Sequence, residues 1–232
     1  MKRSRDSVWS APQMVAGFAQ SAANQTLVTF ASRERARGGA VAVDIGCGAG
    51  RNLVPLARQG WTILGVDLSE PMVDRAATRI REEALSQRAA VVLAPMDNLP
   101  LVSATADLVV AHGIWNLARS AAEFRRSVRE AARVARDGAA LFLFTFSRHT
   151  ISAGETPVAG ESFVFTGFSG EPQCFLTDAQ LLEEMARAGF APDPAVPLTE
   201  HNMSSAQTLI RQRTPVIYEA AFRRLPPFAP AS

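Results

Sequence analysis

The sequence predicts an α/β fold in which a doubly wound, mostly parallel sheet is covered by helices on both faces. Short runs rich in Val, Ile and Leu alternate with longer amphipathic segments, a pattern typical of βαβ units. These runs are apolar on both faces, as expected for strands buried between two layers of helices. A length of 232 residues suffices for one compact domain of this class, so we expect a single domain over residues 1–232.

Seven apolar runs are the candidate strands. The first five cover residues 40–45, 62–66, 90–94, 107–111 and 139–146. Segments 190–198 and 215–222 complete a seven-stranded sheet. Proline offers no N–H to a neighbouring strand, so the prolines of segment 190–198 make it irregular or place it at an edge: Pro192, Pro194 and Pro197.

Helix start and stop signals separate the central runs. Ser69, followed by Pro71, is expected to cap one helix. Ser120 and Glu123 form the pattern of a capping box before a second helix, which is expected to stop at Gly138.

A later helix is expected over residues 178–188. Thr177 and Gln180 form its capping box, and Gly189 is its expected stop.

Two regions fall outside the alternating pattern, and both are candidates to cover a functional site. Residues 9–37 are predicted to form an N-terminal helical cap ahead of the first strand. Residues 148–176 form an insertion after the fifth strand, and long connections in compact domains are usually functional. The cap and the insertion flank a core over residues 40–147, and a C-terminal helix and strands follow over residues 177–225.

Composition and charge exclude several classes of protein. Lys and Arg number 24 against 22 Asp and Glu, and the resulting net charge of +2 is too small for a nucleic-acid-binding surface. Cys47 and Cys174 cannot make a disulfide framework, and no Cys or His cluster has zinc-ligand spacing. No signal peptide or spanning helix is predicted. We therefore expect a soluble cytoplasmic protein with neither nucleic-acid nor membrane partners and without a metal; the oligomeric state is left open.

The sharpest motif is VAVDIGCGAGRN over residues 41–52, where a strand ends at an acid and a glycine-rich bend leads into a helix. Glycine allows a sharp turn and lets a ligand lie against bare backbone, here at Gly46, Gly48 and Gly50. A dinucleotide fingerprint needs a third glycine five residues after the first, but this position is Arg51.

Two acids define the expected ligand. Asp67 follows the second strand 21 residues after Gly46, where a carboxylate can bind both hydroxyls of a ribose. Asp44 precedes the bend, and a carboxylate there repels a pyrophosphate but suits a ligand that carries an ammonium and a sulfonium. This charge argument points to S-adenosylmethionine.

At these residues the sequence resembles the class I S-adenosylmethionine-dependent methyltransferases, motif by motif over roughly residues 40–147. The resemblance implies the Rossmann-like methyltransferase fold with an antiparallel last strand. It places segment 44–50, including Cys47, beside the methionine moiety of the cofactor and makes Asp67 the ribose acid. Leu68 and Met72 are expected to line the same site.

The resemblance also implies two later parts of the cofactor site. Asp97 in APMDNLPL matches the acid beside the adenine amino group, with Asn98 and Leu99 flanking the base. The segment DLVVAHGIWNL places His112 and Gly113 next to the cofactor. It lacks the D/N-P-P-Y/F form of amino-directed DNA, RNA and protein methyltransferases. A small-molecule acceptor is therefore expected. No lysine at a strand end matches the metal-dependent catechol-type enzymes, so no metal is expected.

Catalytic residues are not evident, because a sulfonium is already a good leaving group and positioning supplies most of the acceleration. His112 and His149 are candidate general bases, and Trp115 and His149 are candidate acceptor-pocket residues. The alternatives are that His112 only satisfies a backbone carbonyl, that His149 is a solvated loop residue and that Trp115 is a packing anchor.

The predicted function is methyl transfer from S-adenosylmethionine to a small-molecule acceptor, which leaves S-adenosylhomocysteine. One alternative is an NAD-dependent oxidoreductase, which Arg51 disfavours. The other is a non-catalytic regulator that binds S-adenosylmethionine.

Overall fold

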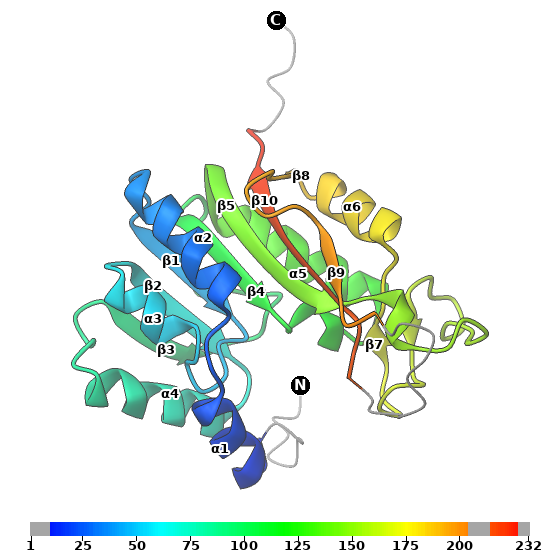
Figure 1. Cartoon of the computed structure of the whole chain (residues 1–232), viewed down its shortest axis with the longest axis horizontal. Coiled ribbons are helices and arrows are strands. Elements are labelled where there is room, and N and C mark those ends of the chain that lie inside the picture. The colour runs from blue at the N-terminus through cyan, green and yellow to red at the C-terminus, as the bar shows by residue number, and fades with distance from the viewer. Residues whose placement is uncertain (1–9, 204–213, 227–232) are drawn as a thin grey trace, which may run out of the picture.

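The sheet is built as the sequence predicts, from parallel strands closed by one antiparallel strand (Figure 1). The computed structural model describes residues 10–203 and 214–226. The strand order is β3-β2-β1-β4-β5-β10-β8, and β9 also pairs with β10. The strands are β1 Val41–Ile45, β2 Thr62–Asp67, β3 Ala89–Leu93, β4 Ala106–His112, β5 Ala135–Phe146, β8 Phe190–Pro192, β9 Thr199–His201 and β10 Ile217–Arg224.

Helices cover both faces of this sheet (Figure 1). Side chains of α2 and α3 bury one face and side chains of α5 and α6 bury the other, in two separate hydrophobic clusters. The pairs of β1 with β2 and β4, of β2 with β3 and of β4 with β5 are parallel, whereas β10 is antiparallel to β5. The helices are α1 Pro12–Gln20, α2 Gln25–Ala36, α3 Leu53–Arg58, α4 Glu70–Glu82, α5 Ala121–Val134 and α6 Asp178–Arg187.

The C-terminal part of the sheet differs from the prediction in one respect. The segment expected as a single strand over residues 190–198 is divided into the short edge strand β8 and, further on, β9. The prolines at positions 192, 194 and 197 have no backbone N–H to donate to a neighbouring strand, and this explains why the segment is not one continuous strand. The edge position and the antiparallel last strand are confirmed.

The helix ends confirm some of the predicted cap and stop residues. Gly189, with φ of +81°, directly follows the C-cap residue of α6 and ends that helix as predicted. Thr177 and Gln180 form a complete capping box on α6. Ser120 accepts a hydrogen bond from the backbone of Glu123, but the Glu123 carboxylate reaches the N–H of Arg119, so the box is only half made. The prediction that Gly138 stops α5 is wrong: the helix ends at Val134, and Gly138 lies inside β5 with φ of +77°.

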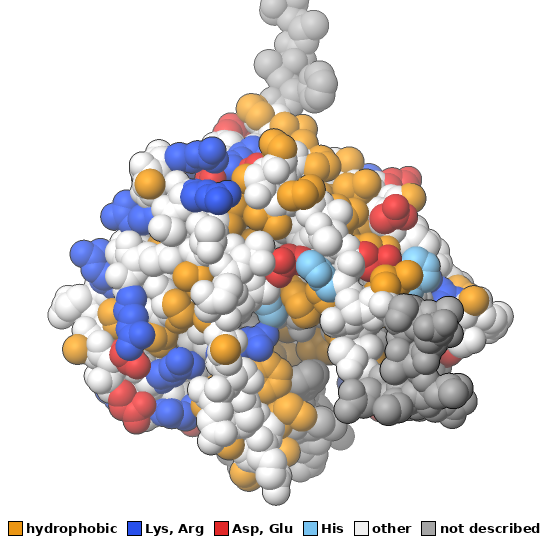
Figure 2. Space-filling model, viewed as in Figure 1, with side chains coloured by type: hydrophobic (Ala, Val, Ile, Leu, Met, Phe, Trp, Pro, Cys, Tyr) orange, Lys and Arg blue, Asp and Glu red, His pale blue; other side chains and the backbone are white. Residues whose placement is uncertain are grey.

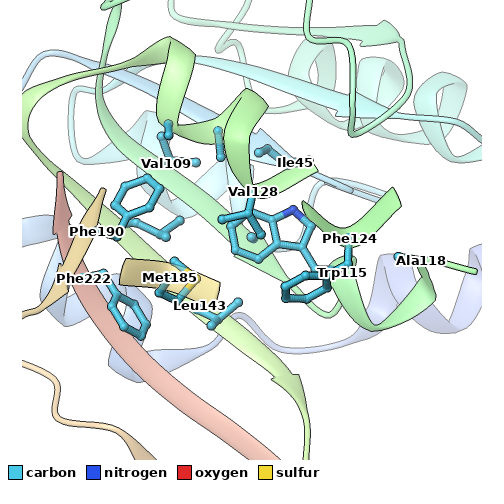
Figure 3. Close-up of a cluster of buried hydrophobic side chains, with 14 of the residues drawn as sticks. Ile45, Val109, Trp115, Ala118, Phe124, Val128, Leu143, Met185, Phe190 and Phe222 are labelled. Carbon is cyan, nitrogen blue, oxygen red and sulfur yellow. The ribbon is translucent and has the colours of Figure 1, made fainter. Parts of the chain in front are cut away.

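The position expected for Trp115 is also wrong. Its side chain does not line a rim but is fully buried in the cluster on the α5 face, where its ring meets Phe124 edge to face. Figure 3 shows it within the cluster that also contains Val128 and Met185. The short 3-10 turn Trp115–Leu117 begins three residues after the end of β4 and its indole is buried, so Trp115 is a packing anchor.

The two regions outside the sheet have different structures. The predicted N-terminal cap contains α1 and α2. The insertion contains the turn Arg148–Thr150 and a small two-stranded sheet, β6 Val164–Phe165 with β7 Gln173–Cys174. No helix among the described residues is long and apolar enough to cross a membrane.

Candidate functional site

The glycine-rich bend between β1 and α3 is held in a conformation that only glycine adopts readily. Gly46, Gly48 and Gly50 have φ values of +72°, +52° and +79°. A Cβ atom at Gly46 would lie 2.7 Å from the side chain of Ile114, which follows β4. The glycine at position 46 therefore supplies both the backbone conformation and the space that lets the loop after β4 approach the bend.

Asp67, the last residue of β2, stabilises the bend by a hydrogen bond to its backbone. Its Oδ2 accepts a 2.9 Å hydrogen bond from the N–H of Gly48, and its Oδ1 accepts a 2.8 Å bond from the N–H of Ser69. Burial raises the pKa of this carboxyl, and the backbone donors oppose the shift. Asp67 thus ties the loop after β1 to the start of α4, and Ser69 occupies the N-cap position of α4 without a side-chain capping bond.

Asp44 lies beneath the bend and is almost completely buried. Its Oδ2 has no hydrogen-bond partner among the described residues. Burial raises the pKa of Asp44 to about 7; the Arg51 guanidinium opposes this shift and the Asp67 carboxylate adds to it. A buried carboxylate oxygen without a donor is costly, so this atom is suited to a cationic or hydrogen-bond-donating ligand group.

Three further predicted cofactor residues lie around the bend. The thiol of Cys47 is buried inside it, where burial raises its pKa and makes it a packing group. Met72 on α4 is buried, and its sulfur would lie 3.9 Å from a Cβ at Gly48. Leu68 is 61% exposed directly after Asp67, so its side chain is accessible to a ligand.

The segment after β3 is anchored to α5. Asp97 forms an ion pair with Arg126, with 3.2 Å between Oδ2 and Nε. Leu99 is buried, and its N–H donates to Glu130 of α5 at 2.7 Å. Asn98, between them in the sequence, is exposed. The adenine contacts expected of these three residues remain a prediction.

His112, the last residue of β4, lies between two nitrogen donors. Its Nδ1 is 3.0 Å from Arg51 Nη2 and its Nε2 is 3.2 Å from Asn24 Nδ2. Burial, with the Arg51 charge, lowers the pKa of His112 to about 3. A neutral imidazole has one lone pair, so it can accept from only one of the two groups. Such a weakly basic imidazole is suited to positioning and not to proton abstraction at neutral pH.

Asn24 connects the N-terminal cap to three parts of the core. Its Oδ1 caps α2 by accepting from the N–H of Leu27 at 2.9 Å, and its own N–H donates to Asn52 Oδ1 at 3.0 Å. Its Nδ2 donates to Glu219 Oε2 of β10 at 2.7 Å, besides facing His112. The sequence reasoning missed this residue, because an N-cap asparagine is an ordinary helix signal.

Glu219 was missed as well, although the sequence contains a signal for it. It is the only acid in the apolar run of residues 216–222, and it is 7% exposed. His201 of β9, with Nε2 3.9 Å from Glu219 Oε1, lies beside it. Figure 2 shows that histidine and acidic side chains gather in the middle of this face of the molecule, beside a hollow.

His149 does not join this group. Its Nδ1 lies 2.8 Å from Oε1 of Glu200, which also accepts from the hydroxyl of Ser147. Glu200 is opposite Tyr218, whose ring belongs to the cluster on the α5 face. Neighbouring residues of a strand point to opposite faces, so Glu219 faces the other side. His112 and His149, each a candidate general base, thus lie apart, and only His112 is beside the glycine bend.

The helix α1 covers the bend from the N-terminal side. Phe18 lies against the Arg51 guanidinium, with 5.7 Å from Cζ to the ring centroid. The hydroxyl of Ser10 is 3.3 Å from that of Ser69, so the start of α1 meets the start of α4. Figure 1 shows α1 beside α4, apart from α2. Within the described residues, no group of His, Cys, Asp or Glu is arranged to hold a metal ion.

Comparison with known proteins supports the class that the sequence motifs predict. Residues 43–143 match a family model described as a methyltransferase domain. A comparison with curated proteins found no match. Residues 43–143 are therefore similar to a methyltransferase domain, in agreement with the class I S-adenosylmethionine-dependent type and the S-adenosylmethionine cofactor that the sequence motifs predict. This supports the methyltransferase interpretation of the glycine bend over that of an NAD-dependent oxidoreductase.

Solved structures share the fold at low sequence identity. An S-adenosylmethionine-dependent methyltransferase from Methanosarcina mazei is similar with a TM-score of 0.64 and 20% identity, over 80% of this chain and 92% of that one. The 1,6-didemethyltoxoflavin-N1-methyltransferase of Burkholderia thailandensis, solved with its named substrate and S-adenosylhomocysteine, has a TM-score of 0.63 and 19% identity, over 86% and 79%. Geranyl diphosphate C-methyltransferase from Streptomyces coelicolor A3(2), solved with Mg²⁺, geranyl diphosphate and S-adenosyl-L-homocysteine, has a TM-score of 0.65 and 15% identity, over 87% and 79%.

The residues at the bend fit this cofactor. The unpartnered Asp44 oxygen would accept a hydrogen bond from an ammonium group, and the adjacent backbone has no side chain at three glycines. The carboxylate of Asp67 keeps further lone pairs besides those used by Gly48 and Ser69.

Proposed function

We propose that this protein transfers a methyl group from S-adenosylmethionine to a small-molecule acceptor. The observation that carries the proposal is the unpartnered carboxylate oxygen of Asp44 at the glycine bend that Asp67 fastens. This arrangement places negative charge where a phosphate-bearing cofactor would be repelled and a cationic one attracted.

Several side chains hold and orient the cofactor in this proposal. Asp44 receives the ammonium group, Asp67 receives the ribose hydroxyls, and Gly46, Gly48 and Gly50 let the ligand approach the backbone. Segment 97–99 closes the adenine end. The bound cofactor supplies a methyl group on a positively charged sulfur.

The protein's remaining work is to align the acceptor and exclude water. His112, with its pKa lowered to about 3, stays neutral and serves as a positioning residue beside Arg51. His149 contacts Glu200 on the other face, so we do not assign it the transfer. An acceptor whose nucleophile is already deprotonated needs no general base.

Two observations support a small acceptor. The N-terminal helix α1 lies over the bend through Phe18 and Ser10, which leaves restricted access from that side. Two proteins of similar fold are named for small substrates, 1,6-didemethyltoxoflavin and geranyl diphosphate.

Calorimetric titration of the pure protein with S-adenosylhomocysteine, S-adenosylmethionine and NADH tests the proposal. We expect binding of the first two in the micromolar range or tighter and none of NADH; NADH binding alone, or no binding of either adenosyl compound, overturns it. Turnover of S-adenosylmethionine with an acceptor library then separates an enzyme from a regulator that only binds the cofactor.

A further inference from the structure

One row of side chains runs across the sheet from the glycine bend. His112 of β4 is opposite Phe144 of β5, and Phe144 is opposite Glu219 of β10. The imidazole stacks on the Phe144 ring, with 4.3 Å between centroids and 11° between planes. Both side chains are partly buried, so part of the stacked pair is exposed next to the proposed cofactor site.

Glu219 lies at the end of this row and differs from the other buried glutamates of the described chain. Glu34 pairs with Arg223 and Glu184 pairs with Arg125, in both cases within 2.7 Å. No Lys or Arg among the described residues forms an ion pair with Glu219; the imidazole of His201 lies 3.9 Å from its Oε1. Buried carboxylates are normally paired with a cation, so the charge of Glu219 is not compensated by a Lys or Arg of the described chain.

The two oxygens of Glu219 have different surroundings. Oε2 accepts a hydrogen bond from Asn24 Nδ2. The same nitrogen also lies 3.2 Å from His112 Nε2, so the Asn24 amide bridges the carboxylate and the imidazole. Oε1 receives no hydrogen bond from the described residues and faces His201, whose side chain is 45% exposed. One oxygen therefore fixes the side chain and the other is free to bind a ligand.

We propose that the stacked His112–Phe144 pair and Glu219 form the acceptor site, and that the acceptor is a small molecule with an aromatic ring and an alkylammonium group, which anchors the molecule while another atom accepts the methyl group. Its ring lies on the stacked pair and its ammonium binds Glu219 Oε1. Glu219 touches the substrate and determines specificity for a cationic acceptor. This inference rests on the proposed methyl transfer and adds the chemical class of the substrate.

Two probes of equal size test the charge preference. Tyramine and tyrosol share a phenol ring and a two-carbon arm and differ in carrying an ammonium or a hydroxyl. We expect calorimetry on protein saturated with S-adenosylhomocysteine to show tyramine binding at least fivefold tighter than tyrosol. Equal affinity, a preference for tyrosol or no binding of either probe overturns the inference.

Glu219→Gln and Glu200→Gln form the matched pair of variants. The glutamine amide at 219 still offers an oxygen to Asn24 but lacks the charge, whereas Glu200 lies on the opposite face beside His149. Glu219→Gln is expected to lower tyramine affinity to that of tyrosol, and Glu200→Gln to retain the preference. A retained preference in Glu219→Gln contradicts the assignment.

A prior titration with S-adenosylhomocysteine distinguishes the two proposals. If the wild-type protein does not bind it, the proposed function fails. If it binds equally to wild type and Glu219→Gln while the amine preference is absent, only the acceptor assignment fails. The thermal midpoint of Glu219→Gln, measured on the same sample, verifies that the variant is folded.

Discussion

The side-chain amide of Asn24 donates a 2.7 Å hydrogen bond to the carboxylate of Glu219, joining residues 195 positions apart. The bond connects the start of α2 to the last strand of the sheet, next to His112. The N-terminal cap is thereby part of the candidate site and not only a cover over it. The ion pair between Glu34 of α2 and Arg223 of β10 makes a second connection between the same two elements.

Asn24→Ala is expected to lower both stability and ligand affinity. The variant loses the cap of α2 and the bond to Glu219, at a cost of about 1–2 kcal/mol. Ser120→Ala removes the equivalent cap of α5 and should cost about 1 kcal/mol without affecting the site. Urea unfolding and titration with S-adenosylhomocysteine measure both effects, and equal affinities in the two variants would argue against a role of Asn24 in the site.

The pH dependence of cofactor binding should follow Asp44. Its pKa is raised to about 7, so the carboxylate that attracts an ammonium group forms as the pH rises through this value. We expect the affinity for S-adenosylhomocysteine to increase about tenfold from pH 5.5 to 7.5. Titrations across this range in one buffer system measure it, and Asp44→Asn should abolish the dependence. A flat profile in the wild type would exclude Asp44 as the ammonium partner.

Asp44→Asn should make the free protein more stable at high pH. The pKa of Asp44 in the folded protein, about 7, exceeds the usual 3.8. The contribution of its protonated form to the free energy of unfolding is therefore fully present below pH 3.8 and is lost as the pH rises through 7. The difference of about three units corresponds to at most about 4 kcal/mol. We expect the variant to melt about 5 °C or more above wild type at pH 8 and at the same temperature at pH 4. Scanning calorimetry at both pH values tests this, and a lower melting temperature at pH 8 would refute it.

Asp67→Ala should weaken cofactor binding at least tenfold. The variant frees the N–H groups of Gly48 and Ser69 and removes the carboxylate expected at the ribose. Asp107→Ala is the control, because Asp107 also accepts two backbone hydrogen bonds, from Ala40 and Val41 at the start of β1. Both variants should lose stability, but only Asp67→Ala should lose affinity in a titration with S-adenosylhomocysteine.

Gly46→Ala should be more damaging than Gly138→Ala. Both glycines have φ in the left-handed region, which costs alanine about 1 kcal/mol. A Cβ at Gly46 also lies 2.7 Å from Ile114, whereas one at Gly138 meets nothing within 4 Å. We expect an additional loss of about 1–2 kcal/mol and weaker cofactor binding for Gly46→Ala alone. Equal unfolding free energies for the two variants would show that Ile114 adjusts without cost.

Local patterns in the sequence predict much of this protein. The alternation of apolar runs and amphipathic helices predicts the parallel sheet, since burial on two faces requires apolar residues at every strand position. The bend at Gly46 to Gly50 and the position of Asp67 are recognisable because adjacent residues in the chain create them. The stop at Gly138 was wrong because a helix can end directly into a strand and leave its glycine inside that strand.

The sequence by itself determined the fold class and the cofactor loop, because both depend on residues close together in the chain. Only the tertiary structure decided which distant side chains meet: it brought Asn24, His112 and Glu219 together, buried Trp115 and placed His149 on the opposite face. The physical reason is that strand order and face set these neighbours, and a single residue of register determines whether a side chain enters the site or the core.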